Sequence, residues 1–183
     1  MLALIVFLAS ILLIMTMGAK ASLSDLKGLT IPNRYSIVAL GIYGACFLLL
    51  TILGRADILP TLTSSLLAAL IFFGVTFIMF SFKLLGAADS KLGTVFSLWV
   101  GLKALPVFLF YMTLMGGVLA IIAIILKKKP MIKEPLVDSW VDKVQKGDSK
   151  VPYGVAIFVG LLATFIKLGY FRYETFVSLL LGA

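Results

Sequence analysis

Residues 62–82 read LTSSLLAALIFFGVTFIMFSF, a stretch without a charged side chain. The hydrocarbon core of a bilayer is about 30 Å thick, and roughly 20 apolar residues in a helix cross it. The stretch is therefore long enough for one crossing. The whole chain is 62% hydrophobic, with a mean hydropathy of +1.16, whereas soluble domains are about 45–50% apolar. The sequence predicts an all-α, polytopic integral membrane protein.

Apolar segments on either side of this stretch predict the remaining crossings. About six transmembrane helices are expected, at residues 2–17, 35–53, 62–82, 92–102, 107–126 and 153–166. The fourth is short for a full crossing, and Lys103 and Pro106 separate it from the fifth. Asn33 is placed to cap the second, and Pro32 to fix the chain that enters it. No separate soluble domain is expected, so residues 1–183 form a single transmembrane domain.

Residues 127–152 are the longest polar stretch of the chain. Within it, Leu136, Trp140 and Val144 recur at helical spacing, and charged side chains take the other face. This pattern predicts an amphipathic helix that lies in the membrane interface, with Trp140 as its anchor. A solvated loop with incidental spacing is the alternative.

The basic residues are distributed unevenly over the predicted loops. Loops 19–34, 83–91 and 127–152 hold three, two and seven of the sixteen Lys and Arg residues. The positive-inside rule therefore puts these loops in the cytoplasm and both termini outside. The expected location is the inner (cytoplasmic) membrane. The net charge of +8 then reflects orientation, and no nucleic-acid partner is expected.

Two of these loops carry related polar motifs. One is Ser24-Asp25-Leu26-Lys27 with Ile31-Pro32-Asn33, and the other is Gly86-Ala87-Ala88-Asp89-Ser90-Lys91. Each motif has an aspartate with a lysine two residues later, and an even number of crossings returns the chain to the same side. Two neighbouring carboxylates share one proton, which lets the pair activate a water molecule. We therefore predict an aspartic peptidase with Asp25 and Asp89 as its catalytic residues.

Other hydrolase chemistries are excluded by what the chain lacks. It contains no histidine and a single cysteine, Cys46. A Ser-His-Asp triad, a Cys-His pair and a His-ligated zinc site are therefore ruled out, and neither a metal nor a cofactor is expected. A Ser90–Lys91 nucleophile pair remains an alternative, although adjacent residues rarely aim both side chains at one atom.

Five residues are candidates for supporting roles beside the aspartates. Lys27 and Lys91 either hold an acidic part of the substrate and tune the aspartates, or extend to lipid headgroups. Gly86 is expected to shape the second motif. Pro32 and Asn33 complete the set of supporting or substrate-binding candidates.

These motifs resemble the type IV prepilin peptidase family, which includes the archaeal preflagellin peptidases. The family pattern is an aspartate followed by I-P-N after an early helix, and G-x-G-D-x-K two helices later. In this chain the first part of the pattern corresponds to Asp25 with residues 31–33, and the second part corresponds to residues 86–91. Residues 151–157, VPYGVAI, resemble the start of the last helix in small members that serve Flp-type (tight adherence) pili.

The resemblance implies a membrane-embedded aspartyl endopeptidase. It would remove the short basic leader peptide from type IV prepilin-like substrates at the cytoplasmic face of the membrane. The implied partners are the apolar helix of a prepilin or pseudopilin and the membrane lipids, and a second copy of the chain is a further candidate. The single transmembrane domain would then be a peptidase domain.

Two departures from the family pattern bear on this implication. Ala88 replaces the glycine before the second aspartate, and we expect it to be tolerated although alanine disfavours positive φ. The paired cysteines and the N-methyltransferase insert of larger members are missing, so only protease activity is implied.

Three other classes compete with the peptidase. Presenilin-like proteases also carry G-x-G-D, but pair it with Tyr-Asp in chains with more helices. A transporter subunit would need acids near the membrane midplane. An inactive assembly or scaffold protein of a pilus or secretion system is favoured by Ala88 alone.

Overall fold

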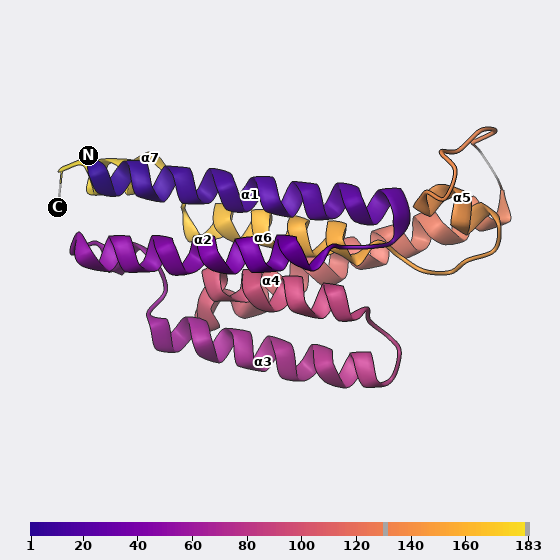
Figure 1. Cartoon of the computed structure of the whole chain (residues 1–183), viewed down its shortest axis with the longest axis horizontal. Helices are drawn as coiled ribbons and strands as arrows, with labels where there is room; N and C mark the ends of the chain where they lie inside the picture. The colour runs from indigo at the N-terminus through magenta and orange to yellow at the C-terminus, as the bar shows by residue number, and fades with distance from the viewer. Residues whose placement is uncertain (130–131, 182–183) are drawn as a thin grey trace.

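The chain folds into an elongated bundle of helices (Figure 1). The computed structural model describes residues 1–129 and 132–181. Its elements are α1 (Leu2–Gly28), α2 (Asn33–Ile52), η1 (Ala56–Ile58), α3 (Leu62–Ser81), α4 (Ala87–Lys128), α5 (Trp140–Gln145), α6 (Tyr153–Leu168) and α7 (Tyr173–Leu181). The described residues contain no strand. The predicted all-α class is confirmed.

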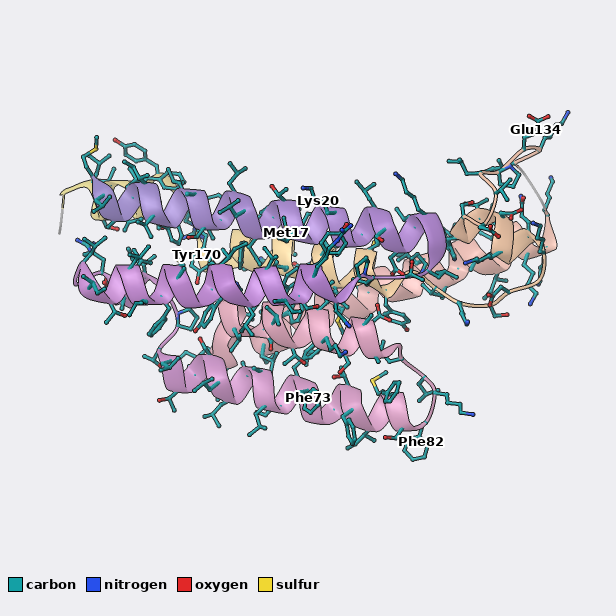
Figure 2. All side chains as sticks on the ribbon, viewed as in Figure 1. Met17, Lys20, Phe73, Phe82, Glu134 and Tyr170 are labelled. Atoms are coloured by element: carbon teal, nitrogen blue, oxygen red, sulfur yellow. The ribbon has the colours of Figure 1, made fainter. Side chains whose placement is uncertain are left out.

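Several of these helices suit a bilayer. Four segments in the described part of the chain are long and apolar enough to span a membrane: α1, α2, α3 with the turn before it, and α4. The pair α6 and α7, bent by 67°, makes a fifth candidate if it counts as one span. Large apolar side chains such as Phe73 on α3 and Phe82 just after it are 44% and 72% exposed and face outward (Figure 2). The chain is a polytopic membrane protein.

The count of four to five candidate spans is lower than the six predicted, and α4 is the reason. The predicted segments 92–102 and 107–126 both fall within this one element. A straight helix of 42 residues would be roughly 60 Å long, about twice the hydrocarbon core. Instead α4 turns back, so that its two ends lie at the same end of the bundle (Figure 1).

The turn in α4 lies at Gly101, two residues before the predicted break. Gly101 has φ 69° and ψ 169°, a conformation open to glycine and strained for other residues. A β-carbon at this position would also lie 2.5 Å from Cβ of Pro60. The Ser64 hydroxyl accepts a 2.9 Å hydrogen bond from the backbone N–H of Leu102. Pro106 is accommodated inside the second arm.

Replacing Gly101 with alanine is expected to destabilise the bundle. The left-handed backbone alone costs an L-residue about 1–3 kcal/mol, and the contact with Pro60 adds to that. Gly117→Ala is the matched control in the same element, because a β-carbon there meets nothing within 4 Å. Thermal unfolding in detergent should show a lower Tm for Gly101→Ala and an equal or higher one for the control. Equal Tm values for the two variants would contradict this account.

The helix in the polar stretch is shorter than predicted and packs on protein. α5 covers six residues, and Leu136 lies outside it with 80% of its surface exposed. Trp140 and Val144 are buried in a small cluster with α4 and α6, and the Trp140 indole N–H donates to the Lys150 carbonyl at 2.9 Å. Trp140 is therefore an internal packing residue, which differs from the predicted membrane anchor. The physical reason is that α4 and α6 present apolar side chains against which the indole ring is buried.

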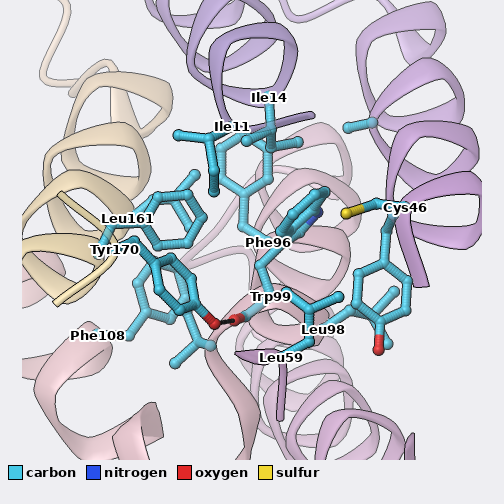
Figure 3. Close-up of a cluster of buried hydrophobic side chains, with 14 of the residues drawn as sticks. Ile11, Ile14, Cys46, Leu59, Phe96, Leu98, Trp99, Phe108, Leu161 and Tyr170 are labelled. Carbon is cyan, nitrogen blue, oxygen red and sulfur yellow. Dashed lines mark hydrogen bonds between the residues drawn. The ribbon is translucent and has the colours of Figure 1, made fainter. Parts of the chain in front are cut away.

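A main hydrophobic core holds the long helices in register (Figure 3). Trp99 of α4 is fully buried and packs edge-on against Tyr43 of α2, with ring centroids 5.5 Å apart. The hydroxyl of Tyr170, after α6, donates to the Trp99 carbonyl at 3.4 Å. This packing brings the end of α1, the start of α4 and the start of α6 to one end of the bundle, opposite the N-terminus (Figure 1).

Candidate active site

Asp25 lies in the last turn of α1. The sequence predicted this residue in a loop, but the helix continues eleven residues past the predicted span 2–17. Its side chain is 5% exposed and faces the start of α6. The backbone N–H of Gly154 donates a 2.7 Å hydrogen bond to its Oδ2. The first turn of a helix has unpaired N–H groups and a partial positive charge, so α6 suits an anionic side chain at this point.

Side chains of α1 hydrogen-bond both backbone polar groups of Gly154, its N–H and its carbonyl. Ser22, one turn before Asp25, shares its one hydroxyl proton between the Gly154 carbonyl at 3.0 Å and the Gly18 carbonyl of its own helix at 2.9 Å. A β-carbon on Gly154 would lie 3.0 Å from Asp25 Oδ2 and 2.8 Å from Ile31 Cδ1. Glycine is therefore the residue that lets α6 approach the carboxylate this closely. We call Ser22, Asp25 and Gly154 the α1–α6 clamp.

Asp89 is the third residue of α4, and it binds the start of its own helix. The Asp89 carboxylate folds back against the backbone of Gly86, the N-cap residue of α4. A β-carbon on Gly86 would lie 2.6 Å from Asp89 Oδ2. The predicted role of Gly86 thus has a geometric counterpart, since the absent side chain leaves room for the carboxylate.

The two aspartates open onto one pocket. This pocket has a volume of about 900 Å³ and is also lined by Gly86, Tyr153, Lys83 and Lys150. Residues 64 positions apart in the sequence are thereby brought together at the end of the bundle where α1 ends and α4 and α6 begin. A backbone N–H holds the Asp25 carboxylate, and both carboxylates face a space large enough for a peptide segment.

The other candidate residues, Lys27, Pro32, Asn33 and Lys91, do not line this pocket. The Lys91 ammonium donates to Asn33 Oδ1 at 3.3 Å and so connects α4 to α2. Asn33 is the first residue of α2 and makes no capping bond, contrary to the prediction, because Pro32 occupies the N-cap position. Lys27 is exposed and lines a separate groove.

The serine next to Asp89 has a structural role. The Ser90 hydroxyl is buried and lies 2.7 Å from the Thr76 hydroxyl of α3. The Lys91 side chain extends toward Asn33 instead. This geometry excludes the Ser90–Lys91 nucleophile pair, because the lysine does not face the hydroxyl that it would activate.

Ala88 is accommodated without strain. It lies in the first turn of α4 with helical backbone, and it is absent from the described residues that have positive φ. Its side chain packs against the main core. The alanine therefore incurs no backbone penalty at this position.

The sequence predicted the aspartates but assigned no role to Gly154 or Ser22. Gly154 falls within residues 151–157, which resembled the start of a last helix. A glycine at the start of a helix allows another segment to approach the backbone closely, and Gly154 was therefore the available sequence signal. Its partner could not be deduced, because the contact spans 129 positions.

The fold and the pocket define a polytopic helical membrane protein with a two-aspartate site at one end of the bundle. Residues 7–121 match the type IV leader peptidase family, and since this is more than half of the chain, the protein belongs to that family. Searches of the curated proteins and of the solved structures each gave no match. The family assignment makes the chain a peptidase, and the matched region includes both aspartates.

Proposed function

We propose that this protein is an aspartic endopeptidase that removes the short basic leader from type IV prepilin-like substrates. The observation that carries the proposal is the shared pocket of Asp25 and Asp89, in a chain of the type IV leader peptidase family. The pocket is at the end of the bundle with the most basic loops. The positive-inside rule favours the cytoplasmic side of the inner membrane for it.

The chemistry follows from two carboxyl groups that share one proton. The ionised carboxylate takes a proton from a water molecule while the water oxygen attacks the scissile carbonyl carbon. The protonated carboxyl donates its proton to the carbonyl oxygen, which gives a neutral tetrahedral diol. When the C–N bond breaks, the amine nitrogen takes a proton from the first carboxyl, and a diol hydroxyl returns one to the second. The pair then again holds one proton.

The substrate geometry follows from the position of the pocket. The apolar helix of a prepilin or pseudopilin lies in the bilayer beside the enzyme, and its leader crosses the pocket at the membrane surface. Because residues 151–157 resemble small members that serve Flp-type pili, the proposed substrate class is the prepilins of such pili. The whole chain then acts as a single transmembrane peptidase domain.

Cleavage in membranes tests the proposal directly. The chain is co-expressed with a candidate prepilin, and loss of the leader is followed by gel shift. An Asp25→Asn/Asp89→Asn double variant serves as the inactive reference. Wild type should shorten the prepilin, and the reference should leave it intact. Equal processing by both proteins would refute the two-aspartate mechanism, and no processing of several prepilins by wild type would refute the substrate class.

A further inference from the structure

A second groove lies on the other side of α1, between α1 and α2. Its volume is about 650 Å³. It is lined by Met17, Lys20, Leu23, Ser24, Lys27, Arg34, Tyr35 and Val38. None of these residues lines the pocket of the two aspartates. We call it the α1–α2 groove.

Helix geometry separates the groove from the active site. Residues of an α-helix are about 100° apart around the axis, so Lys20 and Lys27, seven positions apart, project from nearly the same face. Ser22 and Asp25 project from the opposite face, where they contact α6. Met17 and Lys20 are labelled on α1 in Figure 2. The groove is therefore an independent feature of the α1–α2 hairpin.

Three cations converge in the groove without an acidic partner. Within residues 1–129 and 132–181, no acidic side chain lies within salt-bridge distance of Lys20, Lys27 or Arg34. The Arg34 guanidinium stacks on the Tyr35 ring, 5.3 Å from its centroid, which still leaves its N–H groups available to an anion. Like charges gathered from two helices repel one another, and a bound anion would relieve that repulsion.

The position of the groove indicates where the anion comes from. Leu23 and Val38, which flank the cations, are 55% and 46% exposed. The uncharged stretch of α1 ends just before Lys20. The cations thus lie at the level where hydrocarbon gives way to headgroups, and anionic lipids present phosphate there. We propose that the α1–α2 groove binds the phosphate of an anionic phospholipid headgroup, with the acyl chains along the exposed apolar side chains of the two helices.

Lipid binding to the purified full chain tests this proposal without using peptidase activity. The probes are phosphatidylglycerol, phosphatidylcholine and inorganic phosphate, read by native mass spectrometry and by Tm in detergent. Phosphatidylglycerol should bind to wild type and raise its Tm, and phosphatidylcholine should not. A Lys20→Gln/Lys27→Gln/Arg34→Gln variant should lose affinity for phosphatidylglycerol on the order of 100-fold.

The matched control removes the same charge at the other end of the bundle. Lys103→Gln/Lys167→Gln/Arg172→Gln should retain the wild-type affinity. Equal loss of affinity in both triple variants would show a net-charge effect and overturn the proposal. Unchanged lipid binding in the groove variant would also overturn it. If millimolar inorganic phosphate reproduces the rise in Tm and displaces the lipid, the ligand is a free anion. If lipid binding persists while KM for a prepilin rises in the groove variant alone, the groove serves the substrate.

Discussion

Asparagine in place of either Asp25 or Asp89 is expected to lower leader cleavage by about 10²–10⁴-fold, the usual contribution of general acid–base groups. The substitution keeps the size and shape of the side chain. Its amide oxygen still accepts a hydrogen bond from the backbone, as Asp25 does from Gly154. What it removes is the group that takes or gives a proton. The loss should therefore appear in kcat, at unchanged Tm.

The Asp57→Asn variant is the control for these substitutions. Asp57 lies in η1, on the turn between α2 and α3 at the other end of the bundle, and its side chain is 72% exposed. It should cleave as wild type does. The double variant should be little worse than either single one, because groups that act as a unit are non-additive. Independent, multiplying losses would contradict a shared-proton mechanism.

Alanine at Gly154 is expected to reduce kcat by about 10–100-fold. The added methyl group would lie 3.0 Å from Asp25 Oδ2, so the carboxylate must move away from the N–H that holds it. Displacements of about 1 Å at a reacting group lower rates by up to about 10²-fold. Since Gly154 touches the carboxylate and not the substrate in this account, KM should remain near the wild-type value.

Two further variants separate positioning from stability. Ser22→Ala removes the hydroxyl that holds the Gly154 carbonyl and leaves the contact with Asp25, so its loss of kcat should be smaller. Gly44→Ala on α2 is the neutral control, because a β-carbon there meets nothing within 4 Å. If the activity of Gly154→Ala falls only in proportion to the fraction unfolded, the α1–α6 clamp has no positioning role.

The fold class and the approximate spans were accessible from composition and hydropathy alone. Uncharged stretches of bilayer length and the basic loops between them placed the two motifs at one end of the bundle. Helix limits were less accessible. α1 continues eleven residues beyond its apolar part, because Ser22 and Asp25 find partners on α6. Tertiary contacts thus extended a helix that local composition would have ended.

The parts that the sequence did not predict depend on contacts between distant segments. Gly101 turns α4 back because Pro60 and Ser64 of the neighbouring hairpin pack against it. Trp140 is buried because α4 and α6 offer it an apolar surface. Neither partner can be identified from the pattern around the residue itself.

The contact between Gly154 and Asp25 makes assembly of the two-aspartate site dependent on the order of synthesis. Both aspartates leave the ribosome early, yet the amide that orients Asp25 belongs to a helix made after residue 150. A nascent chain that has inserted only α1 to α4 has its acidic pair without this amide donor. In the proposed mechanism, Asp25 is therefore oriented for catalysis only after α6 has inserted, and a copy that lacks α6 would have reduced activity.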